Sequence, residues 1–181
     1  EWELKEGTIC TPAFSFVRYV KGVVFQVEPS RMQVVDEEPT GDGTDSPVSA
    51  LAAAYVSKLP HVQYKAVGAN FVAVSLCPQP DQFMLERYLT FGSWNCDSLR
   101  PVSLGVNLQY PVAQSSLNLS LKAGSVSQSG EQEARTGVVI EGNCHQDTPS
   151  AEGVMVAVRT FKEKLRSSLS ICARILDVSG D

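Results

Sequence analysis

Strict alternation of apolar and polar residues over 102–112, 117–122 and 138–145 constrains the fold of this chain more than any other feature. From residue 102 to 112, every even position holds Val, Leu or Tyr, and every odd position holds Ser, Gly, Asn, Gln or Pro. Successive side chains of a β-strand point to opposite faces, so this period of two predicts half-buried strands. Such strands are typical of an antiparallel sheet with one face packed and the other in water.

Helical spacing replaces this alternation after residue 147. Apolar residues recur at intervals of three and four from Val154 to Ile175, with Thr148 expected as the N-cap and Pro149 at the first helical position. A helix of about 27 residues rises about 40 Å, which is long enough to cross a whole sheet. A shorter helix over 47–59 is predicted by its own apolar spacing and by the proline in its first turn.

Two further stretches add strands to the predicted sheet. Residues 13–37 show three strand patterns separated by short turns, which is typical of a meander. Residues 64–77 are apolar at both odd and even positions, which predicts a central strand covered on both faces. Within this strand, Gly68 indicates a bulge or a close backbone approach, and Asn70 requires hydrogen bonds from the protein.

Together these patterns predict an α+β fold. We expect two layers, with a largely antiparallel sheet of about seven strands, helices on one face and a long C-terminal helix. A chain of 181 residues fits one domain, residues 1–181. The rhythm of strands closed by a helix leaves a second interpretation open, two similar βββα halves over 13–60 and 64–176.

The composition is that of an ordinary folded soluble protein, with 43% hydrophobic and 19% charged residues. No apolar run reaches the roughly 18 residues that a membrane span needs, so we expect no membrane association. The five cysteines are widely spaced and form no CxxC pair. This pattern indicates reduced thiols and predicts a cytoplasmic location.

The net charge of −5 disfavours binding to free nucleic acid, whose affinity for proteins comes largely from phosphate neutralisation. The final helix is a local exception, because Arg159, Lys162 and Arg166 form a basic stripe along it. This stripe is either a solvated helix face or a local contact with nucleic acid.

The loop over 36–46 is strongly acidic and shows a weak likeness to a calcium loop. An EF-hand needs a glutamate at the twelfth loop position, and the twelfth residue counted from Asp42 is Ala53. We therefore expect a solvated acidic loop. The chain also lacks a glycine-rich phosphate loop, and we predict no metal and no cofactor.

The sequence offers little material for catalysis. It contains no GxSxG elbow and only two histidines, His61 and His145. The one enzyme-like cluster pairs Cys144 with His145, but neighbouring residues of a strand point to opposite faces and cannot meet as nucleophile and base. We therefore predict no catalytic residue, although an undetected small enzyme stays open.

The polar side of the predicted C-terminal strands is the better candidate for a site. It carries Asn107, Gln109, Asn118, Ser120, Lys122, Glu141, Asn143 and His145. These groups form either an ordinary wet sheet face or a recognition surface. The leading hypothesis is a non-catalytic binding or assembly subunit that acts through protein–protein contacts, with another protein or with itself. One alternative is a small polar ligand, or a substrate, held in a pocket near His145, and another is nucleic-acid contact within a ribonucleoprotein through the basic stripe.

Overall fold

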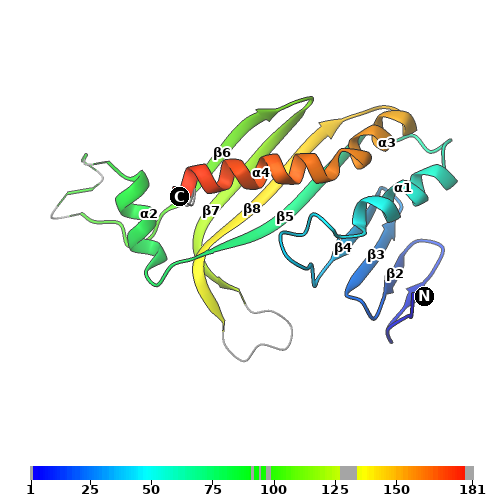
Figure 1. Ribbon diagram of the computed structural model, residues 1–181, viewed down its shortest axis with the longest axis horizontal. Helices are drawn as coiled ribbons and strands as arrows, with labels where there is room; N and C mark the ends of the chain where they lie inside the picture. Colours follow the sequence, from blue (N-terminus) through cyan, green and yellow to red (C-terminus); the bar gives the residue numbers. More distant parts are fainter. Residues whose placement is uncertain (1, 91, 94, 97–98, 127–133, 178–181) are drawn as a thin grey trace. The chain divides into compact units, whose positions relative to one another are not determined.

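The computed structural model describes residues 2–90, 92–93, 95–96, 99–126 and 134–177, and over these residues the chain forms eight strands and four helices (Figure 1). In chain order they are β1 (Ile9–Cys10), β2 (Ser15–Arg18), β3 (Val23–Glu28), β4 (Arg31–Asp36), α1 (Val48–Lys58), β5 (Ala66–Leu76), α2 (Pro80–Tyr88), β6 (Gly105–Val112), β7 (Ser115–Val126), β8 (Arg135–Asp147), α3 (Ala151–Arg159) and α4 (Phe161–Leu176). The contacts divide the chain into two compact units. Unit 1 comprises the described parts of residues 1–67 and 147–166, and unit 2 those of 68–146 and 167–181.

The sheet of unit 1 is an antiparallel meander in the order β1-β2-β3-β4. Its register places Val17 opposite Phe25 and Phe25 opposite Val34, so these apolar side chains share one face. Helix α1 packs against this face, with the ring centroids of Tyr55 and Phe25 5.7 Å apart. Helices α1 and α3 share a small buried core formed by Val56, Val154 and Val158.

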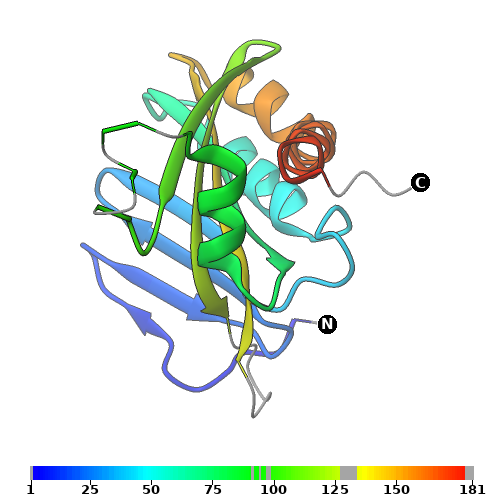
Figure 2. The same cartoon turned by 90° about the vertical axis from the view of Figure 1, so that its left-hand side faces the viewer.

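The sheet of unit 2 has the order β5-β8-β7-β6. Its register pairs Leu117 with Cys144 and Leu121 with Ile140, which places the alternating apolar residues of β7 and β8 on one buried face. Residues of α2 and of the C-terminal half of α4 complete this core, among them Met84, Cys172 and Leu176. In Figure 2, where α4 is seen nearly end-on, the helix lies to one side of the green and yellow strands.

The α+β class and the antiparallel pairing are confirmed, whereas the single sheet of about seven strands is not found. The strands form two sheets of four, each packed against its own helices. The connection from β4 to β5 carries the acidic loop and α1, so these two strands are not hairpin neighbours. Instead β5 pairs with β8, as the hydrogen bond from Cys77 N–H to the Thr136 carbonyl illustrates (3.3 Å).

The long C-terminal helix is two helices, which corrects the expected 40 Å rod. Thr160 separates α3 from α4, and its Oγ1 lies 3.1 Å from the carbonyl oxygens of Val156 and Ala157, to which it donates. A threonine that bonds back to the preceding turn bends a helix at that point. The N-cap is Ser150 and not Thr148, because the Ser150 hydroxyl accepts from the Gly153 amide at 3.1 Å.

Strand β5 is an edge strand, which corrects the prediction of a central strand covered on both faces. Its odd positions, such as Phe71, pack on the core of unit 2. Its even positions do not, and the side chains of Val72 and Leu76 are 66% and 64% exposed. Among the residues that the structure describes, no helix is both long and apolar enough to cross a membrane.

Candidate functional site

The candidate site is the polar face of unit 2, the side of its sheet that points away from the core. The register places Gln109 opposite Asn118 and Asn118 opposite Asn143. Asn143 then donates a hydrogen bond from Nδ2 to Oδ1 of Asn70 on β5. Four carboxamides, one from each strand, therefore cross the sheet in a single line, which we call the carboxamide row.

Charges on the polar face cancel locally. In the neighbouring row, Asn107 lies opposite Ser120, and Ser120 lies opposite Glu141. The Lys122 ammonium lies 2.7 Å from the Glu141 carboxylate, and both side chains are about half exposed. The centre of the face therefore presents neutral hydrogen-bonding groups together with one self-compensated ion pair, and Arg135 lies on the same side at the start of β8.

The seven residues predicted to bind lie together on this face. They are Asn107, Gln109, Asn118, Lys122, Glu141, Asn143 and His145. Two hydrogen bonds hold side chains of the row in place. Gln109 Nε2 donates to the Ser116 hydroxyl (2.7 Å), and Asn143 donates to Asn70. The expectation that the protein itself supplies a hydrogen bond to Asn70 is confirmed.

Sequence reasoning missed three residues that adjoin this site. Asn70 belongs to the carboxamide row, and the exposed side chains of Val72 and Leu76 form an apolar margin beside it on β5. Residues 64–77 are apolar at both odd and even positions. This pattern predicted burial on both faces of the strand, whereas the even side exposes Val72 and Leu76. A Cβ at Gly68 would lie 3.3 Å from the Asn143 amide nitrogen, so the close approach at this position is made by a side chain.

The enzyme-like cluster is separated as the strand alternation predicts. Cys144 is 4% exposed and packs in the core opposite Leu117, whereas His145 is exposed and lies opposite Ser116 on the polar face. They cannot act together as a nucleophile and its base. Within the described part of the chain, no group of three or more His, Cys, Asp or Glu residues could hold a metal ion.

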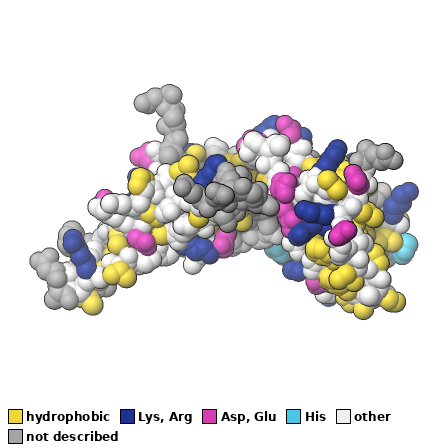
Figure 3. All heavy atoms as spheres, turned by 90° about the horizontal axis from the view of Figure 1, so that it is seen from below, with side chains coloured by type: hydrophobic (Ala, Val, Ile, Leu, Met, Phe, Trp, Pro, Cys, Tyr) yellow, Lys and Arg dark blue, Asp and Glu magenta, His cyan; other side chains and the backbone are white. Residues whose placement is uncertain are grey.

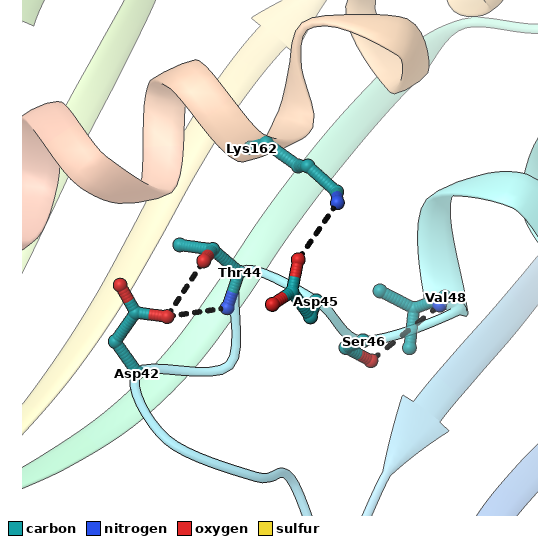
Figure 4. A network of polar contacts seen from close by, with 6 residues as sticks. All are labelled: Asp42, Thr44, Asp45, Ser46, Val48 and Lys162. Atoms are coloured by element: carbon teal, nitrogen blue, oxygen red, sulfur yellow. Dashed lines mark hydrogen bonds and ion pairs between the residues drawn. The ribbon is translucent and has the colours of Figure 1, made fainter.

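The acidic loop of unit 1 is folded back on itself and is not simply solvated, as Figure 4 shows. The Asp42 carboxylate accepts from both the hydroxyl (2.6 Å) and the amide (2.9 Å) of Thr44, whose side chain is buried. These two hydrogen bonds, with a smaller contribution from the charge of Arg166, lower the pKa of Asp42 below its usual value of 3.8. The loop is exposed to solvent, as expected, over 37–42 and at Asp45, and only Thr44 is buried.

This loop also partly compensates the basic stripe. The Lys162 ammonium lies 3.2 Å from the Asp45 carboxylate (Figure 4), while Arg159 and Arg166 are exposed. On the face that Figure 3 presents, Lys and Arg side chains lie beside Asp and Glu side chains in several places. The stripe therefore offers less free positive charge than the sequence alone indicates.

A shallow cleft of about 220 Å³ opens in unit 1, at the turns that join β1 to β2 and β3 to β4. It is lined by residues 11–15 and 27–29, none of which belongs to the polar face. Its one titratable group, Glu28, already accepts from Gln26 Nε2 and lies 3.7 Å from Arg31. The cleft therefore adds no catalytic arrangement, and a pocket near His145 stays a prediction.

Comparisons of the chain with models of protein families, with curated proteins and with solved structures find no match. What the polar face can do follows from its own residues and geometry.

Proposed function

We propose that this protein is a non-catalytic binding or assembly subunit, and that the polar face of unit 2 is its contact surface for a protein partner. The carboxamide row carries the proposal. It places one amide side chain on each of four paired strands, on the side of the sheet that the core leaves open.

Carboxamides suit the recognition of another polypeptide because each can donate and accept hydrogen bonds at once. A partner's backbone and polar side chains present the same two kinds of group. The contacts of Gln109 with Ser116 and of Asn143 with Asn70 limit side-chain freedom before binding. Less conformational entropy is then lost on association, which favours a rigid sheet over a loop as the binding element.

The apolar margin beside the row complements these polar groups. Protein interfaces usually combine a desolvated apolar patch with a polar surround. Val72 and Leu76 supply exposed apolar surface next to Asn70, and burying such surface contributes about 25 cal/mol per Å². The polar face and its margin together have the composition of an interface.

The same chemistry argues against a nucleic acid at this face. Lys122 is compensated by Glu141, so the centre of the face leaves little positive charge for phosphates. The aromatic residues of the strands, Phe71 and Tyr110, both pack on the core side, which leaves bases no ring to stack on. Contact with nucleic acid through Arg159, Lys162 and Arg166 therefore stays a separate prediction.

Site-specific photo-crosslinking in the source organism tests the proposal. A benzophenone amino acid replaces Asn118 at the centre of the face, or Ser170, which is exposed on α4 on the core side of the sheet. We expect a discrete adduct with a protein from position 118 and none from position 170. The adduct should disappear when Asn107→Arg and Gln109→Arg are added. Identical products at both positions, or none at 118, would refute the proposal.

A further inference from the structure

The outer edges of the two sheets differ in how they are protected against pairing with another chain. Strand β1 has only two residues, β4 carries charges at Arg31 and Asp36, and β6 contains Pro111. Short strands, charges and prolines are the usual means by which edge strands avoid pairing. Strand β5 has none of them, because its 11 residues include no charge and no proline.

The backbone groups that β5 presents at its open edge can be assigned from its contacts with β8. Cys77 N–H bonds to the Thr136 carbonyl, and the Ser75 carbonyl lies close against Gly137. Odd residues therefore direct their backbone toward β8. Because this direction alternates along a strand, the even residues 72, 74 and 76 direct N–H and C=O toward the open edge.

Two of these residues, Val72 and Leu76, form the exposed apolar margin, and Val74 between them is half-buried; their spacing is self-complementary. Antiparallel pairing of two β5 strands about Val74 sets Val74 against Val74 of the second copy. It also sets Val72 against Leu76 of the second copy, and Leu76 against its Val72. Directly opposite side chains in such a ladder have Cβ atoms about 4.5–5.5 Å apart, so each exposed residue gains an apolar contact. The three pairs also exchange about six backbone hydrogen bonds.

We propose that β5 pairs with β5 of a second copy of this chain, about a two-fold axis at Val74. The contact is isologous, as in most homodimers, and it brings no charged residue of β5 against a like charge. Even residues of both copies point to the same side, so two polar faces join on one side of a continuous sheet. The pairing uses the backbone edge of β5 and the proposed partner contact uses the polar face, and the two share the side chains of the apolar margin, Val72 and Leu76.

We favour a second copy over an unrelated strand because two β5 strands paired about Val74 place apolar residues opposite apolar residues. An unrelated strand would need apolar residues at three alternate positions to match Val72, Val74 and Leu76. Another β5 supplies them at this spacing in the register about Val74.

Charge substitutions at the two exposed positions test both the contact and its register. In the double variant Val72→Lys/Leu76→Lys each lysine faces a lysine of the other copy, and in Val72→Lys/Leu76→Glu each faces an opposite charge. Both sites are exposed, so the substitutions spare the core of unit 2. A control with the same added charge is Ser167→Lys/Ser170→Lys on α4, where both serines are exposed. Sedimentation equilibrium over a concentration series measures each dissociation constant, and circular dichroism checks each fold.

We expect a dimer for the unmodified chain and for the α4 control. The double lysine variant should weaken the dimer by about 100-fold, and the lysine–glutamate variant should restore it. A chain that stays monomeric throughout the series overturns the proposal, and so does a double lysine variant that still dimerises. If the lysine–glutamate variant stays as weakly dimeric as the double lysine variant, the register about Val74 is refuted. A monomer that copurifies with a foreign protein, lost in the double lysine variant, overturns the choice of a second copy. Because Val72 and Leu76 also belong to the apolar margin of the proposed contact surface, crosslinking at Asn118 is measured in the chain that keeps both residues, so that each proposal can fail by itself.

Discussion

Replacing Gly142 by alanine tests how the core of unit 2 is packed. Gly142 lies on the buried side of β8, where the Phe71 ring of β5 extends over it. A Cβ added at this position would lie 2.2 Å from two atoms of that ring and 2.8 Å from a third. Real Cβ atoms do not approach that closely, so the ring would have to leave its place.

The expected cost follows from what the ring can do. Phe71 packs against the buried core cluster and cannot turn away without losing apolar contacts. Overpacking of this kind usually costs about 1–3 kcal/mol, and we expect the upper half of that range because the obstacle is a rigid ring. A loss of about 2–3 kcal/mol is a large share of the roughly 5–15 kcal/mol that stabilises an ordinary domain.

Urea unfolding followed by circular dichroism measures the change in stability. Gly105→Ala is the matched control, because a Cβ there meets only the Leu121 carbonyl oxygen, at 3.9 Å, and should change stability by less than about 0.5 kcal/mol. Phe71→Leu removes the ring, so the double variant should cost less than the sum of the two single changes. Equal effects of Gly142→Ala and Gly105→Ala would show that the ring does not lie over Gly142.

Three further predictions concern local interactions. Ser150→Ala removes the N-cap of α3 and should lower the free energy of unfolding by about 1 kcal/mol in urea titrations. The pKa of the Asp42 carboxyl is lowered in the folded chain, so its stabilisation is present above about pH 4 and is lost as the pH falls through the folded pKa. An NMR titration should therefore find this pKa below the usual value, and Thr44→Ala should raise it. A double-mutant cycle on Lys122 and Glu141 should give a coupling below about 1 kcal/mol, because both side chains are half exposed, and added salt should weaken it.

Sequence patterns predicted the parts of the fold that depend on neighbours along the chain. The alternation over 102–112 and 138–145 became β6 and β8, because half-buried strands leave one polar residue for each apolar one. The same alternation placed the seven predicted binding residues on one face and separated Cys144 from His145. The break at Thr160 was missed, since its apolar neighbours keep helical spacing on both sides of it, and the break coincides with a threonine hydroxyl that bonds back to the preceding turn.

The pairing order of the strands could not be predicted in this way. A run that is apolar at both odd and even positions fits two kinds of strand equally well. One is a central strand, and the other is an edge strand with one exposed apolar side. Only the place of β5 at the end of the sheet, paired with β8, decides between them. Asn70 was missed for the same reason. Its membership of the carboxamide row depends on Asn143, which lies more than seventy positions along the chain.

Strand β5 connects the two proposals, because it contributes both Asn70 to the polar face and the edge about Val74. If two copies join at this edge, a partner with two matching surfaces meets two polar faces held on one sheet. Such linkage raises apparent affinity by about 10²–10⁴ without any new contact. Val72→Lys/Leu76→Lys and Val72→Lys/Leu76→Glu both replace the apolar margin, but only the first should be monomeric. It should therefore dissociate from an immobilised partner faster than the second, and as a single exponential. A dissociation rate unchanged between dimeric and monomeric forms would mean that face and edge act separately, with each polar face engaging its partner alone.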